Sequence, residues 1–338
     1  MSRVAVALLL VSPVLGQASA PDVSSMYDRS VVMREQRRLG TRVTEIYEKA
    51  YRPNLLPEEQ QALAQVRFDF PLEGEPVLGY SSNANTRVAT LPAVSLLFFE
   101  DFCTAYAWLY VKGYRLETVE EYMTMLKYKS SEAFGGRYPP PLQALSIPAD
   151  ALNDPKVNDL SLRFRNSGYA FILGHELGHV RYHHPFYNEV SVAVSQANEE
   201  QADLFGLELM RRNTEIPIGG MLFFQAAIFY FQNRADFASE EEWQGFLAKS
   251  ATHPLTAHRL RVLSEHVFRL APSFAQGQPN PAAAIDTVHF IGERFAEFAK
   301  FLDYPTLQRV MRAKAERSPL SSLAPRRTKE TLQDFPVK

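Results

Sequence analysis

Two histidines and a glutamate stand close together near the middle of the chain, in the stretch FILGHELGHV. His175 and His179 are four residues apart, so a helix places both imidazoles on one face, where they can bind one metal ion. Glu176 points elsewhere on the helix and would reach a water molecule on that metal rather than the metal itself. The pattern predicts a zinc site in which Glu176 acts as general base.

An ordinary buried helix is the alternative interpretation of this stretch, because the pattern arises by accident in about one chain in a hundred. Gly174 and Gly178 argue against it, since each costs up to about 1 kcal/mol in a helix interior. Glycine at these positions allows a neighbouring backbone, or a metal and substrate, to come close. We therefore favour the metal site and keep the structural helix as an alternative.

A third metal ligand is needed, and its position separates the types of zinc peptidase. Tyr182 and Pro185 stand where a metzincin has glycine and histidine, which excludes that class. The segment SQANEEQADLFGLELM instead offers Glu199 on a second predicted helix. Glu200 stays open as the ligand, because a helix rotated by one position would present it instead. Asp203, one turn after Glu199, can accept the N–H of a liganding imidazole and fix its tautomer.

The elements that must position these residues are predicted to be mostly helical. Apolar residues recur at helical spacing, and Gly, Pro and Asn interrupt them between the first two helical stretches. Helices are expected over residues 26–68, 95–114, 188–212, 218–234, 254–270 and 282–301, with a shorter one to 317. One or two short strands are expected, with a β-favouring run at 86–90. The predicted fold class is therefore mostly α (α+β) with a small sheet.

Two local signals refine this assignment. Asn166 or Ser167 is expected to cap the helix that carries the two histidines, and Pro185 to end it. The apolar stretch 216–231 is shorter than the roughly 20 residues needed to span a bilayer. We expect it to be a buried core helix.

The ends of the chain differ in character from its middle. Arg3, the apolar run 4–15 and a small-residue site ending at Ala20 are typical of a signal peptide, residues 1–20. Export to the periplasm or secretion, without a transmembrane span, is therefore expected. The further organisation predicted is given by residue range. It consists of an N-terminal helical layer (21–75), a metallopeptidase domain (76–317) with a Pro-rich insertion around 131–160 as a candidate lid, and a flexible tail (318–338).

Composition excludes several function classes. The chain has 338 residues, of which 46% are hydrophobic and 12% aromatic, which is enough for a substantial core. Its formal net charge of −2 gives no basic field, so no nucleic-acid partner is expected. Cys103 is the only cysteine, so no internal disulfide can form. The chain also lacks the Gly-x-Ser-x-Gly motif of a serine hydrolase.

Three separated motifs, GHELGHVRYHH, EEQAD and THPLTAHRL, carry a resemblance to a known family. Over roughly residues 82–263 the chain resembles the gluzincin metallopeptidases of the HtpX and CAAX-prenyl-protease type. The core LGHELGH also resembles that of the Lit-type phage-exclusion peptidases. The resemblance implies a gluzincin-like zinc peptidase domain with flanking helices and one Zn²⁺ per chain. It implies a protein or peptide substrate, such as an unfolded protein of the cell envelope.

The same resemblance implies roles for residues outside the first motif. His253 would lie near the substrate oxyanion as a catalytic residue, and Arg259 would pair with an acidic residue of the second ligand helix, such as Asp203. His184 stands where the family often has a histidine. Asn83 precedes an alanine as in a family stretch that leads into an edge strand, which would bind an unfolded peptide by strand addition. The Pro-Gly-Gly that follows this stretch in the family is missing here.

The sequence leaves three hypotheses about function. The favoured one is a zinc-dependent endopeptidase, because ligands and base are all present. The second is a non-catalytic metal-binding chaperone or assembly factor on the same scaffold. The third is a purely structural helix that binds no metal.

Overall fold

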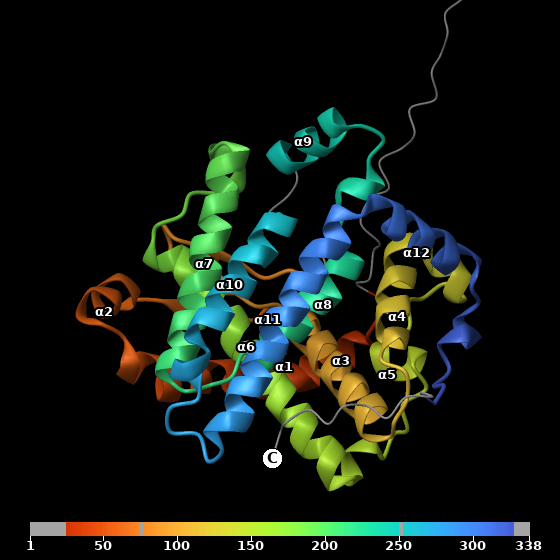
Figure 1. Ribbon diagram of the computed structural model, residues 1–338, viewed down its shortest axis with the longest axis horizontal. Helices are drawn as coiled ribbons and strands as arrows, with labels where there is room; N and C mark the ends of the chain where they lie inside the picture. Colours follow the sequence, from red (N-terminus) through yellow and green to blue (C-terminus); the bar gives the residue numbers. More distant parts are fainter. Residues whose placement is uncertain (1–24, 75–76, 250–252, 328–338) are drawn as a thin grey trace, which may run out of the picture.

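The computed structural model describes residues 25–74, 77–249 and 253–327. The predicted signal peptide, residues 1–20, and its cleavage site after Ala20 therefore lie outside the described residues. The described part is mostly helical with one small sheet (Figure 1), which confirms the predicted fold class at this level.

Twelve α-helices occur in these described ranges. They are α1 (Arg29–Glu45), α2 (Pro57–Leu63), α3 (Ala93–Val111), α4 (Glu117–Tyr128), α5 (Pro141–Ala144), α6 (Pro155–Arg181), α7 (Val192–Arg212), α8 (Ile218–Tyr230), α9 (Glu240–Lys249), α10 (Ala257–Phe274), α11 (Pro281–Asp303) and α12 (Pro305–Arg317). The three strands are β1 (Arg67–Asp69), β2 (Ser81–Asn83) and β3 (Val88–Thr90). Helices α4, α5 and α9 and strand β1 were not predicted from the sequence.

The sheet has the strand order β1-β3-β2. β3 pairs in parallel with β1 and antiparallel with β2. β2 is therefore an edge strand of this sheet, and it also contacts α6. β2 thus lies beside the helix that carries His175 and His179.

Helix α6 starts earlier than the sequence suggested. Its N-cap is Asp154, whose Oδ1 accepts the N–H of Lys156 at 2.9 Å, and Pro155 occupies the first helical position. This arrangement suits a helix start, because proline has no N–H to leave unpaired. Asn166 and Ser167 lie inside the helix, where they bond to Arg42 of α1 and to the backbone before α8. The predicted cap was therefore wrong.

Helix α10 also begins at another residue than predicted. The Thr256 side chain accepts the N–H of Arg259 as the N-cap, so the helix starts at Ala257 rather than at Pro254. His253 consequently lies before the helix, at a bend in the chain. This position leaves its side chain free to turn toward α6 and α7.

One hydrophobic core runs through the described residues, from Met26 to Leu323. It joins the predicted N-terminal layer (21–75) to the predicted domain (76–317), because α1 packs against α3 and α6. Helix α3 is long and apolar enough to cross a membrane by length and composition, and 72% of its most apolar window is buried in the fold. Helix α8, within the apolar stretch 216–231, is also almost wholly buried.

The Pro-rich segment 131–160 packs on the core in its described form. Its short helix α5 contacts α3, and the Tyr122 hydroxyl donates to the Pro139 carbonyl at 2.8 Å. Residues from Pro155 onward belong to α6 rather than to the insertion.

Residues 318–327, the described part of the predicted flexible tail, contact the rest of the fold. Leu323 is fully buried, and the Arg115 N–H donates to the Arg326 carbonyl at 2.9 Å. An apolar side chain thus packs on the core within this segment, whose flexibility stays a prediction. Residues 328–338 lie outside the described residues.

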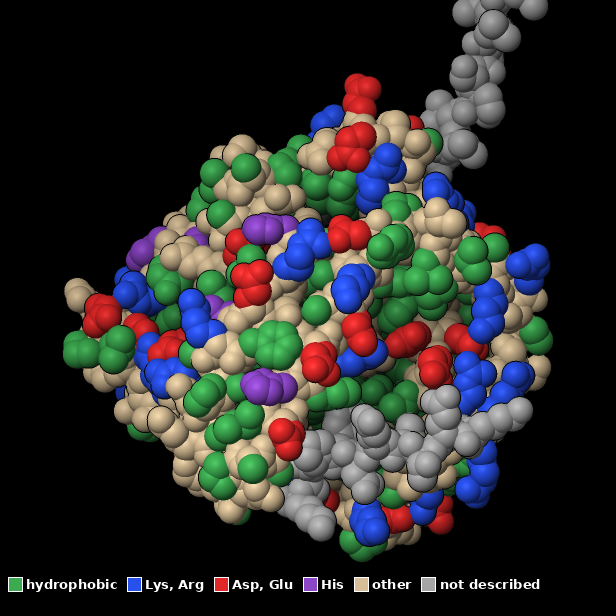
Figure 2. Space-filling view, in the orientation of Figure 1, with side chains coloured by type: hydrophobic (Ala, Val, Ile, Leu, Met, Phe, Trp, Pro, Cys, Tyr) green, Lys and Arg blue, Asp and Glu red, His purple; other side chains and the backbone are tan. Residues whose placement is uncertain are grey.

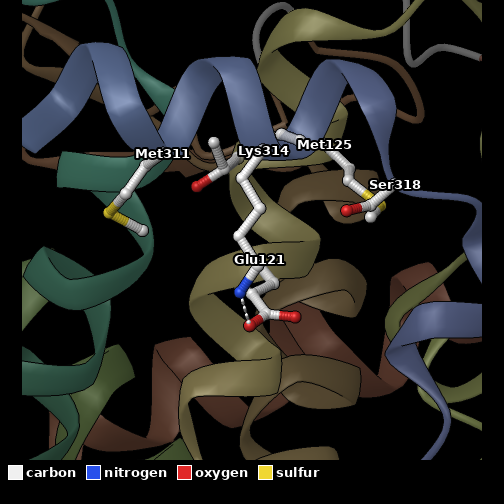
Figure 3. A pocket seen from close by; sticks show the side chains of 7 residues that line it. Glu121, Met125, Met311, Lys314 and Ser318 are labelled. Carbon is white, nitrogen blue, oxygen red and sulfur yellow. Dashed lines mark hydrogen bonds and ion pairs between the residues drawn. The ribbon is translucent and has the colours of Figure 1, made fainter.

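Helix α12, just before this segment, packs against α4. Figure 3 shows Lys314 reaching from α12 to Glu121 of α4 above a small pocket that Met125 and Met311 also line. The pocket holds only about 10 Å³, the room of about one water molecule. On the face shown in Figure 2, acidic and basic side chains are interspersed, in agreement with the small net charge of −2.

A buried carboxyl in α3 gives a prediction about stability. Asp101 accepts a hydrogen bond from the Tyr27 hydroxyl at 2.7 Å, and burial raises the pKa of Asp101 to about 7. The folded state therefore favours the neutral form, and this contribution to stability is lost as the pH rises from about 4 to about 7. Asp101→Asn keeps the acceptor and removes the charge. We expect the variant to gain about 1–3 kcal/mol at pH 8 and little at pH 4.

Urea unfolding at both pH values measures this difference. The exposed Asp69 of β1 supplies the control, since Asp69→Asn at a surface position should change the free energy of unfolding at pH 8 by less than about 0.5 kcal/mol. An equal effect of Asp101→Asn at both pH values would contradict the prediction.

Candidate metal centre

Four side chains from three segments meet at one point. They are His175 and His179 of α6, Glu199 of α7 and His253 before α10, and their potential ligand atoms all lie within 4.8 Å of one another. Nε2 of His175 is 3.1 Å from Nε2 of His179. The Glu199 carboxylate lies 3.5 Å from the first of these nitrogens and 3.4 Å from the second. The group could hold a metal ion.

A close crossing of α6 and α7 sets the spacing of these side chains. A Cβ added at Gly174 would lie 2.8 Å from the Gly206 Cα, and one added at Gly178 would lie 2.8 Å from the Ala202 Cα. Real Cβ atoms do not approach other atoms so closely, so the helices need glycine here. This explains the two glycines of the sequence motif by the approach of a neighbouring backbone.

Asp203 fixes the orientation of His175. Its Oδ1 is 2.8 Å from Nδ1 of His175. Burial acts against the charge of Asp203, but Arg259 and His175 lower its pKa below the ordinary value. An ionised carboxylate can only accept a hydrogen bond, so Nδ1 of His175 carries the hydrogen. Nε2 of His175 then has a free lone pair on the side of the other potential ligands. The contact that the sequence suggested between Asp203 and an imidazole is present.

Arg259 connects both acids of α7. Its Nε and Nη2 donate to Asp203 at 2.6 and 2.8 Å, and its Nη1 lies 2.8 Å from Oε2 of Glu199. Burial alone would raise the pKa of Glu199, but His253 and Arg259 hold it well below the ordinary value. Both carboxylates are therefore charged in the metal-free protein, and the pairing with Arg259 compensates for their burial.

Glu200, the alternative third ligand, lies outside this group. Its Oε1 is 3.2 Å from Nε2 of His258, whose side chain is 70% exposed. The rotation of α7 thus brings Glu199, and not Glu200, to the histidines of α6. This follows from the buried face of α7, which includes Ala202 and Gly206 against α6.

His184 contacts the far side of His179. Nδ1 atoms of the two rings are 2.9 Å apart, and Nε2 of His184 is 2.9 Å from Oε1 of Gln201. Burial lowers the pKa of His179 well below its ordinary value. A neutral imidazole whose other ring nitrogen is in contact with a neighbouring side chain has the form that binds a metal. The contact of Gln201 with His184 was not predicted from the sequence.

Glu176 is buried beside the four-residue group and only partly bonded. Its side chain is 1% exposed, and its Oε2 has no hydrogen-bond partner among the described residues. Burial raises the pKa of Glu176 above its ordinary value, and His253, His175 and Ser82 oppose this. A buried oxygen without a partner is costly, and a water or substrate group in the site would supply one.

His253 contacts both the candidate metal centre and the backbone next to the sheet. Its Nδ1 lies 3.0 Å from both oxygens of Glu199, and its Nε2 lies 3.0 Å from the backbone carbonyl of Tyr80. Burial opposes its charge, but Glu199 raises the pKa of His253 to about 9. Sequence reasoning missed the Tyr80 carbonyl, because a backbone acceptor leaves no signature in the sequence. Tyr80 directly precedes β2, so His253 ties the edge strand to the centre.

Comparisons with known proteins do not add a family to this geometry. The chain matches no family model, no curated protein and no solved structure. The arrangement of the residues themselves therefore carries the proposal about function.

Proposed function

We propose that this protein is a zinc-dependent endopeptidase of the gluzincin type, acting on proteins or peptides. The observation that carries the proposal is the position of Glu176, with a buried and unpartnered Oε2, beside a group of histidine and glutamate ligands. A site that only stored a metal would have no use for a buried carboxylate without a partner. Its presence supports hydrolytic chemistry.

The donor set supports zinc. Two imidazole nitrogens and one carboxylate form a ligand set typical of catalytic zinc in peptidases, with one position left for water or substrate. His175, His179 and Glu199 would hold the ion, one per chain. Asp203 and Arg259 would keep His175 and Glu199 in place through the contacts described above.

The chain's own groups account for the proton transfers. Zinc, when bound, would lower the pKa of a water molecule and polarise the substrate carbonyl. Glu176 would take the proton of the attacking water and deliver it to the leaving amine. His253, whose Nδ1 and Nε2 are paired with Glu199 and the Tyr80 carbonyl, would stabilise the developing negative charge on the substrate oxygen through the positive charge of its ring.

The edge strand β2 supports a peptide as the substrate. Its residue Ser82 lies near Glu176, and β2 pairs only with β3 among the described strands. An extended peptide added to this edge would run past the metal ligands with its backbone hydrogen-bonded. In this mode of binding the protein recognises the backbone of the substrate rather than its side chains, which suits an unfolded protein. The signal-peptide pattern of residues 1–20 supports the cell envelope or the exterior as the place of action.

Hydrolysis of an unfolded protein tests the proposal. The chain from residue 21 onward, loaded with one zinc, should cleave reduced and unfolded casein. A chelator should stop the reaction and added zinc should restore it. Absence of cleavage by the zinc-loaded chain, with both unfolded casein and short peptides, would refute the proposal.

A second candidate function rests on the proximity of His253 to the other ligands. If all four side chains bind the metal, as their 4.8 Å grouping permits, the centre is closed like a structural zinc site. The protein would then be a non-catalytic metal-binding chaperone or assembly factor. The two candidates differ in what His253 does for the metal.

His253→Ala separates these candidates. For the endopeptidase we expect zinc affinity to change by less than about tenfold and kcat to fall by about 10²-fold, because a group that stabilises the oxyanion is lost. His258→Ala, at an exposed histidine paired with Glu200, is the control and should change neither. A loss of zinc affinity beyond about 100-fold, larger than the removal of an outer partner produces, would favour the closed centre.

A further inference from the structure

A second cavity lies apart from the metal centre. Its volume is about 290 Å³, and none of the metal-centre residues lines it. Three parts of the fold enclose it: the first turns of α6, the connection between α7 and α8, and the start of α11. In Figure 1 the α7–α8 connection and the start of α11 lie toward the lower left. This volume lies near the lower end of the range for small-molecule sites.

The walls of this cavity are mostly apolar, with one acid and one base among them. The apolar lining residues are Leu160, Phe164, Ile216, Ile218, Pro279, Ala283 and Ala284. The charged lining residues are Arg163 of α6 and Glu215 of the α7–α8 connection. Such a combination of apolar walls with few charged groups is typical of a site for a small ligand.

Glu215 has an unused carboxylate. It makes no ion pair or side-chain hydrogen bond with any described residue, although it is partly buried in the cavity wall. Burial raises the pKa of Glu215, against the influence of Arg163. No described cation bonds to this partly buried carboxylate, so a cationic group of a ligand would find a favourable place beside it.

Arg163 offers the opposite charge. Its Nε contacts Asp159 of the same helix at 2.9 Å, but both side chains are at least half exposed, at 50% and 61%. Such an exposed pair contributes little, and it leaves the Nη groups available. The N-terminus of α11, where Asn280 is the N-cap, also lines the cavity. The positive end of that helix favours an anion.

We infer that this cavity binds a small zwitterion with an apolar body, namely a free apolar α-amino acid or a short dipeptide. The ammonium group pairs with Glu215, the carboxylate pairs with Arg163 beside the start of α11, and the side chain packs on the apolar wall. The inference does not depend on the peptidase proposal, since the cavity shares no residue with the metal centre.

Calorimetric titration with three related compounds tests this inference. L-phenylalanine carries both charges, phenethylamine lacks the carboxylate, and 3-phenylpropionate lacks the ammonium group. We expect saturable binding of phenylalanine with a Kd of about 0.1–1 mM, and at least about tenfold weaker binding of each analogue. Absence of phenylalanine binding up to about 10 mM, or equal binding of an analogue, would overturn the inference.

Variants of the lining residues link binding to this cavity. Glu215→Gln and Arg163→Gln should each weaken phenylalanine binding by about tenfold or more, since each removes one ion pair. Ala283→Phe should abolish binding by filling the cavity, and it keeps both charges. Glu241→Gln, at an exposed acid of α9, is the control and should bind as the parent chain does. Thermal melts of all four variants monitor folding.

The metal centre is the other place where an amino acid could bind. Titration of the metal-free chain removes that route, because a carboxylate would then have no metal to bind. Binding of phenylalanine that disappears with the metal, or that persists unchanged in Glu215→Gln and Ala283→Phe, would overturn the inference. A failure of the peptidase test would leave the binding result unaffected, so the two proposals can fail separately.

Discussion

Glu176→Gln should lower kcat for peptide hydrolysis by about 10²–10⁴-fold and leave the zinc content unchanged. Glutamine has nearly the same size and shape but cannot take a proton from water. The side chain is 1% exposed, so solvent cannot readily replace the missing base. Zinc binding should persist, because Glu176 makes no contact with Glu199 or the ligand nitrogens among the described contacts.

The measurement compares casein cleavage and metal content for both proteins after identical zinc loading. Glu265→Gln, at an exposed acid of α10, is the matched control and should keep full activity. Undiminished hydrolysis by zinc-loaded Glu176→Gln would show that this residue is not the base. The hydrolysis would then need another proton acceptor.

Glu199→Gln should weaken zinc binding by more than about 100-fold, whereas Glu200→Gln should leave it within about twofold. The two acids are neighbours in the sequence but have different surroundings. Glu199 is 2% exposed and lies beside both histidines of α6. Glu200 faces the exposed His258. A neutral amide is a poorer zinc ligand than a carboxylate, so only the first change affects the metal.

Competition with a chromogenic chelator measures both affinities. Circular dichroism of the metal-free variants shows whether each one folds, which matters because Glu199→Gln removes a charge paired with Arg259. Asp203 still pairs with Arg259 in that variant, so we expect a folded protein. Equal loss of zinc in both variants would contradict the assignment of Glu199 as the ligand.

Helical periodicity explains why most of the centre could be predicted. The four-residue spacings of His175 to His179 and of Glu199 to Asp203 are local, so a single helix already places each pair on one face. Only the rotation of α7 separates Glu199 from Glu200. That rotation follows from packing between α6 and α7, which the sequence does not specify.

Contacts between distant segments were the part that could not be predicted. Strand β1 has three residues and pairs in parallel with β3, so its identity depends on a partner far along the chain. The Tyr80 carbonyl that contacts His253 is a backbone group, which any residue would supply. The start of α6 was misplaced for a related reason. Asn166 has the chemistry of a helix cap, but it bonds to Arg42 instead.

The crossing of α6 over α7 has a consequence for how this protein can change in evolution. A methyl group at Gly174 would lie only 2.8 Å from the Gly206 Cα, closer than real Cβ atoms approach. A substitution there would push the helices apart and carry Glu199 away from the histidines. Descendants of this chain are therefore expected to retain the close crossing of α6 and α7 even where the outer contacts of the metal ligands change.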